Sequence, residues 1–205
     1  MTVTFRPAKP ADVEQAIPLI YSSGPDAFSY VFAHATKGDA QAFLGRAFVD
    51  GGGTFGYRNH TVAESNGNVI GIGATYSGDG ALATTAAVAT QIFKAYGTSA
   101  PGIIGRGLRI ERVMPPPKKS VQYIAHLGVN PAHQGEGIGS HLIDRFLAQG
   151  RKDGKRVAEL DVSVENPGAE RLYERLGFTV SELRTSNLAN EFGTVVDHHR
   201  MVMEL

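Results

Sequence analysis

A glycine-rich turn separates an apolar strand from an amphipathic helix in the second half of this sequence. Residues 123–129 have strand composition, residues 134–139 form the turn, and apolar residues recur at helical spacing up to Gly150. The first N–H groups of a helix lack intrahelical partners and lie at the positive end of its macrodipole, so a turn without side chains there can bind an anion through its backbone. The alternative is a tight turn that needs glycine only for its positive φ angles.

Two common nucleotide-binding motifs do not match this turn. A P-loop ends in Gly-Lys-Ser/Thr, whereas the sequence after Gly137 is Ile138-Gly139-Ser140-His141 and has no lysine for the phosphates. A dinucleotide fingerprint has G-x-G-x-x-G spacing and successive βαβ units, whereas this turn reads G-x-G-x-G and no such units precede it. Walker-type ATP binding is therefore rejected, and dinucleotide binding is disfavoured.

Composition narrows the class of protein. The 205 residues are enough for about one domain and contain no cysteine, which leaves no disulfide, thiolate metal site or cysteine nucleophile. Lys+Arg and Asp+Glu are balanced at 20 each, so we expect neither nucleic acid nor an anionic membrane as a partner. The first residues lack the apolar core of a signal peptide, which makes the cytoplasm the expected location.

The sequence predicts strands and helices interspersed along the chain. We expect a strand over 2–6, helices from Pro10 to Gly24 and over 39–49, and a hairpin that turns at Asn66-Gly67. A helix over 80–97 is followed by a broken, locally basic stretch over 98–120 that contains Pro115-Pro116-Pro117. After the glycine-rich turn and its helix, we expect a buried strand over 157–164, a helix over 169–176 and a closing strand pair, 178–183 with 195–205.

Two motifs resemble those of a known family. Leu127-Gly128-Val129-Asn130-Pro131 followed by Gln134-x-x-Gly137-x-Gly139 is similar to motif A of the GNAT N-acetyltransferases, and Asn166–Phe178 is similar to their motif B. The resemblance is close over residues 120–205. It implies a single α/β domain over 1–205 of α+β type, with a mixed, mostly antiparallel sheet, a splayed parallel central pair and flanking helices. Residues 77–120 fit no part of the family pattern and are expected to be an insertion near the acceptor site.

The resemblance also implies acetyl-CoA as cosubstrate, without a metal. In the family, pantetheine lies in the gap between the parallel strands and the turn binds the pyrophosphate. The residues carried over as cofactor-binding are Leu127, Gly128, Val129, Gln134, Gly135, Glu136, Gly137, Ile138, Gly139, Ser140, Asn166, Ala169 and Tyr173. Asn166 has an alternative role as a helix cap before Pro167. Arg151, Lys152, Arg171 and Arg175 are near enough in sequence to meet the 3′-phosphate, and none is assigned.

Two residues match the family's catalytic positions. The Leu127 amide is the expected donor to the thioester carbonyl, where negative charge develops during attack. Tyr173 occupies the position of the general acid that protonates the leaving thiolate; its alternative role is to pack the helix against the sheet.

The general base is left open. Some family members have a strand glutamate where this chain has Tyr123. Residues 123, 125 and 127 share one face of a regular strand, so His126 points to the opposite face unless a bulge reverses it. Glu111, Asp161, His198 and His199 are no better supported as bases, and deprotonation through water is a further alternative. The His198-His199 pair is expected at a strand surface rather than in a metal site.

The function expected from the resemblance is direct acetyl transfer to an amine of a small molecule or an amino terminus. A GNAT-like module that binds acyl-CoA without turnover is the first alternative, and transfer of another acyl group or to an oxygen is the second. The excess of Arg106, Arg109, Arg112, Lys118 and Lys119 favours an acceptor with a carboxylate or phosphate over a polyamine. A homodimer is left open.

Overall fold

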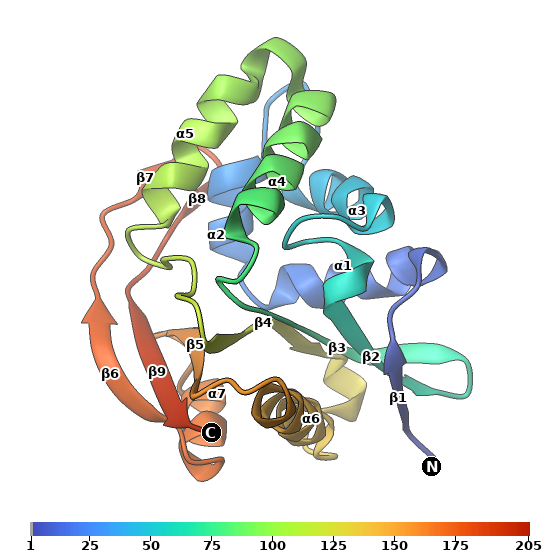
Figure 1. Cartoon of the computed structure of the whole chain (residues 1–205). Helices are drawn as coiled ribbons and strands as arrows, with labels where there is room; N and C mark the ends of the chain where they lie inside the picture. Colours follow the sequence, from blue (N-terminus) through green and yellow to red (C-terminus); the bar gives the residue numbers. More distant parts are fainter. Residues whose placement is uncertain (1) are drawn as a thin grey trace.

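The computed structural model describes residues 2–205 and is shown in Figure 1. The strands are β1 (Thr4–Pro7), β2 (His60–Ser65), β3 (Asn68–Tyr76), β4 (Val121–Val129), β5 (Val157–Ser163), β6 (Thr179–Arg184), β7 (Ala189–Asn190), β8 (Gly193–Thr194) and β9 (His198–Glu204). The α-helices are α1 (Val13–Ser22), α2 (Pro25–Phe32), α3 (Ala40–Asp50), α4 (Ala81–Tyr96), α5 (Ala100–Ile110), α6 (Ile138–Lys152) and α7 (Pro167–Arg175). Short 3₁₀ turns are η1 (Pro10–Asp12), η2 (Tyr57–Asn59), η3 (Gly97–Ser99) and η4 (Pro131–His133).

One sheet organises the chain. Its seven strands run in the order β1-β2-β3-β4-β5-β9-β6, and the short pair β7-β8 is separate. Only β4 and β5 pair in parallel, and their register covers Val121–Tyr123 against Val157–Glu159. Beyond Tyr123 the two strands have no ladder between them, although both continue. The predicted mixed sheet with a splayed parallel pair is thus confirmed.

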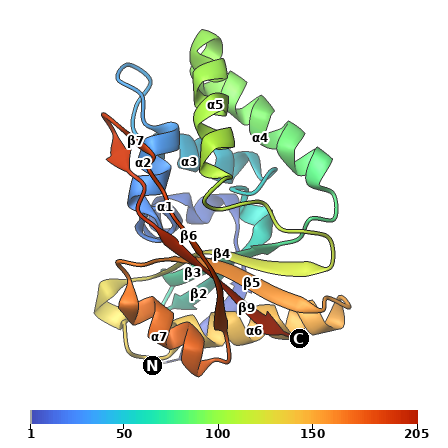
Figure 2. The same ribbon diagram turned by 90° about the vertical axis from the view of Figure 1, so that its left-hand side faces the viewer.

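Helices cover both faces of the sheet. α1 to α5 lie on one face, and α6 and α7 lie on the other, as the two views at right angles show (Figures 1 and 2). Each layer has its own apolar core: Phe43, Phe48 and Ile72 belong to the first, and Leu142 and Phe178 belong to the second. The strand pleat separates the two cores, because alternate residues point to opposite faces.

Glycines bring helices close to the central strands. A Cβ on Gly128 of β4 would lie 2.1 Å from the Leu19 carbonyl oxygen of α1, and one on Gly73 of β3 would lie 2.8 Å from the Phe146 ring of α6. Any side chain at either position would therefore push a helix away from the sheet. These contacts bring β4 close to α1 and β3 close to α6.

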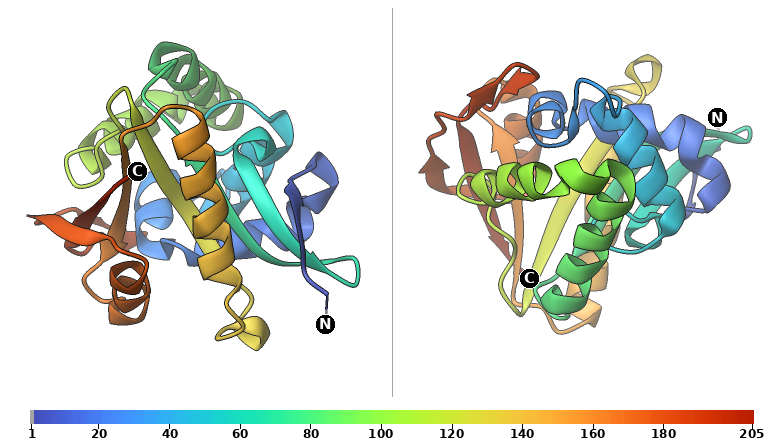
Figure 3. Two further views of the ribbon diagram at one scale, coloured as in Figure 1. Left: turned by 60° about the horizontal axis from the view of Figure 1, so that its bottom comes forward. Right: turned by 90° about the horizontal axis from the view of Figure 1, so that it is seen from above.

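The stretch over 98–120 was expected to be broken, and this prediction was wrong for its first half. Residues 100–110 form α5, which packs beside α4 above the α1–α3 layer (Figure 3). Three glycines lower the helix propensity of this segment. Burial outweighs propensity here, because Ile103 is only 1% exposed and the Arg106 guanidinium donates to the carbonyls of Tyr30 and Ala33. Helix α2, which begins at Pro25 after its N-cap Gly24, was also not predicted as a separate element.

None of the helices over residues 2–205 is long and apolar enough to cross a membrane. The Asn66-Gly67 hairpin, the helix over 81–96 and the closing β6-β9 pair are confirmed.

Candidate active site

A single cavity of about 1290 Å³ joins the glycine-rich turn to the helical layer. Its wall includes the turn before α6, the separated ends of β4 and β5, and the start of α7. It continues between α2, α4 and α5. The cavity thus passes through the gap between the two parallel strands and reaches both sides of the sheet's central region.

The turn before α6 presents free backbone donors. Gly135 and Gly137 have φ of 85° and 81°, in the region that favours glycine, and Gly137 is the N-cap of α6 with no side-chain cap. The amides from Gly135 to Ser140 donate to no backbone carbonyl within residues 2–205. A Cβ at Gly135 would meet nothing within 4 Å, which leaves the turn open for an anionic group.

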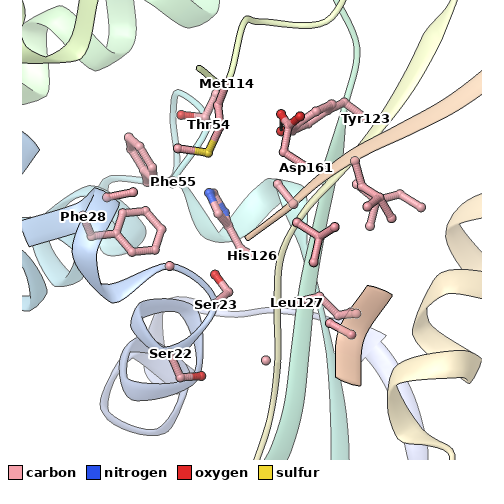
Figure 4. Close-up of a pocket in the computed structure, with 18 of the residues that line it drawn as sticks. Ser22, Ser23, Phe28, Thr54, Phe55, Met114, Tyr123, His126, Leu127 and Asp161 are labelled. Carbon is pink, nitrogen blue, oxygen red and sulfur yellow. Dashed lines mark hydrogen bonds between the residues drawn. The ribbon is translucent and has the colours of Figure 1, made fainter. Parts of the chain in front are cut away.

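Strand β4 contains a bulge at its centre. Ala125 pairs with Ala74 and Gly128 with Ile72, so His126 and Leu127 stand opposite Gly73 alone. His126 has φ of 55°, which is uncommon for a residue with a side chain. Through this bulge His126 faces the cavity together with Tyr123, while Leu127 points away, toward the α6 side (Figure 4). The sequence placed His126 on the face opposite Tyr123 unless a bulge reversed it, and the structure has that bulge.

A second imidazole contacts His126. This second imidazole is His60, whose Nε2 lies 3.1 Å from His126 Nδ1. His60 Nδ1 lies 2.9 Å from the Gly56 carbonyl oxygen. Burial lowers the pKa of His60 to about 4, and burial together with His60 holds the pKa of His126 well below its usual range. Both rings are therefore neutral near pH 7.

Tyr123 and Asp161 form a separate buried cluster beside the same cavity. The Tyr123 hydroxyl donates to Asp161 at 2.7 Å, and Arg200 donates to both Asp161 oxygens at 2.7 Å. Arg200 also bonds Glu159 at 2.7 Å. Burial and the Asp161 charge hold the pKa of Tyr123 well above its usual range, so Tyr123 is a donor and does not replace a glutamate base.

Helix α7 supplies Tyr173 and its neighbours. Tyr173 is 8% exposed, lines the cavity and packs edge-on against Phe178. Burial raises the pKa of its hydroxyl to about 12, so it keeps its proton at neutral pH. The Asn166 side chain accepts from the Ala169 amide at 3.0 Å, which confirms its role as a helix cap. Asn166 and Ala169 also line the cavity.

The structure brings nearly all of the predicted site residues to one cavity. Of those carried over as cofactor-binding, only Glu136 does not line it; the Glu136 carboxylate lies 3.3 Å from His133. Among the other candidate bases, Glu111, Asp161 and His198 line the cavity, whereas His199 contacts Glu170 at 3.1 Å. His60 was not identified in the sequence, because it lies far from His126 along the chain and belongs to no motif.

The basic residues of 98–120 do not form part of the cavity. The cavity wall includes none of the basic residues Arg106, Arg109, Arg112, Lys118 and Lys119. Within residues 2–205, the charged side chains that line the cavity are Glu111, Asp161 and Arg175. Arg106 is held by backbone carbonyls of α2 and its neighbour. These basic side chains therefore lie outside the cavity and do not favour an acceptor with a carboxylate or phosphate there.

Comparison with known proteins points to one family. The acetyltransferase (GNAT) family model matches residues 26–178. An uncharacterized N-acetyltransferase of Methanocaldococcus jannaschii is 42% identical over 66 residues, which are 32% of this chain and 29% of that protein. The L-methionine sulfoximine/L-methionine sulfone acetyltransferase of Salmonella typhimurium is 35% identical over 77 residues, 38% of this chain and 44% of that protein. These matches span less than half of either relative.

Solved structures share the fold. The protein yncA from Salmonella typhimurium, solved with its cofactor acetyl-CoA, superposes with a TM-score of 0.56 at 20% identity. The superposition covers 100% of this chain and 95% of that one.

Proposed function

Because this chain belongs to the acetyltransferase (GNAT) family, we propose that it transfers the acetyl group of acetyl-CoA directly to the nitrogen of a small amine. The observation that carries the proposal is the single cavity, which joins a helix start with free amides to an apolar chamber through the gap between β4 and β5. Such a path can hold a long thioester at one end and an acceptor at the other.

The helix start supports acetyl-CoA as the donor. Its free amides and the macrodipole of α6 suit a pyrophosphate, and the open β4 edge beyond Tyr123 offers backbone groups to pantetheine. In this proposal the Leu127 amide holds the thioester oxygen, and the Tyr173 hydroxyl gives its proton to the leaving sulfur. Asn166 and Ala169 form the adjoining wall.

The chamber favours a small acceptor with an apolar body. Its wall between α2, α4 and α5 carries Phe28, Phe55, Val88, Ile92, Ile104 and Met114. α4 and α5, which lie within 77–120, line the acceptor end, and we expect them to hinder an extended peptide. The relative that acetylates L-methionine sulfoximine also acts on a small molecule.

A panel of acceptors tests the proposal. We expect thiol release from acetyl-CoA to be fastest with small amines that carry an aryl or alkyl group, and slow with polyamines and histone-like peptides. Calorimetry with acetyl-CoA and with longer acyl-CoA esters, run in parallel, separates the alternatives. Binding without thiol release on any acceptor would indicate a binding module, and faster release from another ester would change the donor.

A further inference from the structure

The hydrogen bonds around His60 determine which nitrogen of His126 carries a proton. The Gly56 carbonyl can only accept, so His60 Nδ1 carries the hydrogen in the 2.9 Å contact. In a neutral imidazole the other nitrogen is an acceptor, and His126 Nδ1 must therefore donate to His60 Nε2 across 3.1 Å. His126 Nε2 is left with an unshared electron pair.

Several contacts hold this arrangement in place. The Phe55 ring stacks on His126 at 5.4 Å and the Phe28 ring lies at 5.8 Å, which fixes the imidazole plane. The Gly56 carbonyl is fixed as well, because a Cβ at Gly56 would lie 2.3 Å from the Gly51 carbonyl carbon. A bulge with an uncommon φ at a non-glycine residue is a form of backbone strain that clusters at functional sites.

We propose that His126 Nε2 is the general base that takes the proton from the acceptor amine, and that His60 is a positioning residue that sets its tautomer. This inference rests on the proposed function. It follows from the bulge, which aims His126 into the acceptor chamber beside Leu127, and from the chain of contacts that ends at Gly56.

The proposed transfer forms one bond, breaks another and moves two protons. The neutral amine nitrogen bonds to the thioester carbon and its proton passes to His126 Nε2, while the carbon–sulfur bond breaks and the thiolate takes the Tyr173 hydroxyl proton. Nitrogen becomes far more acidic once it bonds to carbon, so a weakly basic imidazole is sufficient at that stage. His126 and Tyr173 return to their starting states by proton exchange with solvent.

The other candidate bases on the cavity wall, Asp161, Glu111 and His198, are less suited to this task. His198 Nδ1 is engaged with the Val196 carbonyl oxygen at 2.8 Å. Asp161 already accepts hydrogen bonds from Tyr123 and Arg200, and Tyr123 keeps its own proton. Glu111 is the C-cap residue of α5 and does not belong to β4, the strand that carries His126 and Leu127. His60 is the titratable side chain in direct contact with His126.

His126→Asn is the sharpest test. Asparagine tolerates a positive φ and places an amide donor near the position of Nδ1, but it lacks the Nε2 atom. We expect kcat to fall by ~10²–10⁴, the Kd for acetyl-CoA to stay within about twofold, and added imidazole to restore part of the rate. A folded variant with at least half of the wild-type kcat, measured where chemistry limits the rate, would overturn the assignment.

His60 gives a paired test of positioning. His60→Leu removes the acceptor for His126 Nδ1–H, whereas His60→Gln retains an oxygen that can accept it. We expect His60→Leu to lower kcat at least tenfold and to change the acid limb of the pH profile, and His60→Gln to recover most of the rate. Equal activity and equal pH profiles in the two variants would refute the positioning role.

Measurements on the wild type keep the outcomes distinct. The acid limb of kcat should have its midpoint below the usual histidine value of about 6.5, and a midpoint at or above that value would overturn the proposal even if the variants did not fold. If the wild type releases no thiol with any amine, the proposed function fails. If it turns over and His126→Asn does too, only the base assignment fails.

Discussion

At the scale of single residues, His60 makes the folded protein sensitive to acid. Its pKa falls from 6.5 to about 4 on burial, so the unfolded chain binds a proton between these values and the native protein does not. The free energy of unfolding should therefore decrease as the pH falls from 6.5 to 4, by about 3 kcal/mol from this group. The full contribution is present above pH 6.5.

Urea unfolding of the wild type and of His60→Leu at several pH values checks this prediction. The variant should lose stability less steeply below pH 6.5, although His126 keeps part of the dependence through its own lowered pKa. The same slope in both proteins would contradict the account of His60.

Removing the hydroxyl oxygen of Tyr173 tests its proposed role as the general acid. Because its hydroxyl would act on sulfur only as sulfur leaves, Tyr173→Phe should lower kcat by ~10²–10⁴ and change the KM for acetyl-CoA much less. Phenylalanine preserves the edge-on contact with Phe178, so the variant should fold. Unchanged turnover, measured where chemistry limits the rate, would assign Tyr173 to packing alone.

At the scale of elements, the start of α6 is tested by a matched pair of glycine substitutions. Gly137 and Gly154 both have positive φ, 81° and 70°, and Gly154 follows the far end of α6. Aspartate strains the backbone similarly at both positions, but only Gly137→Asp would set bulk and negative charge against a pyrophosphate. We expect Gly137→Asp to weaken acetyl-CoA binding by more than tenfold in calorimetry, and Gly154→Asp to leave it unchanged. Equal affinities would mean that the turn does not bind the donor.

Helix α5 can be tested through its own glycines. A Cβ at Gly105 would meet nothing within 4 Å, so Gly105→Ala should raise the free energy of unfolding by roughly 0.5–1 kcal/mol through helix propensity. Ile103→Ala, at a buried site, should lower it by about 2–5 kcal/mol. Denaturant unfolding measures both changes, and a destabilising Gly105→Ala would argue against a helix over 100–110.

At the scale of the whole molecule, the sequence predicted the parts that depend on local pattern. The Asn66-Gly67 hairpin and the turn before α6 have strong signals in a few adjacent residues. The helix over 100–110 lacked such a signal, because its glycines and Pro101 have low helix propensity. Its apolar face stabilises the helix only through packing against the rest of the protein. The His60–His126 contact could not be predicted either, since it joins β2 to a bulge in β4.

The central claim is that one cavity joins an acetyl donor to a small amine, and the most direct measurement follows the acetyl group itself. With acetyl-CoA labelled in the acetyl carbon and a small arylalkyl amine, the label should appear in the amide of that amine. One thiol should be released for each amide formed, at a rate well above that without enzyme. Label that stays in acetyl-CoA with every amine, although acetyl-CoA binds, would contradict the account.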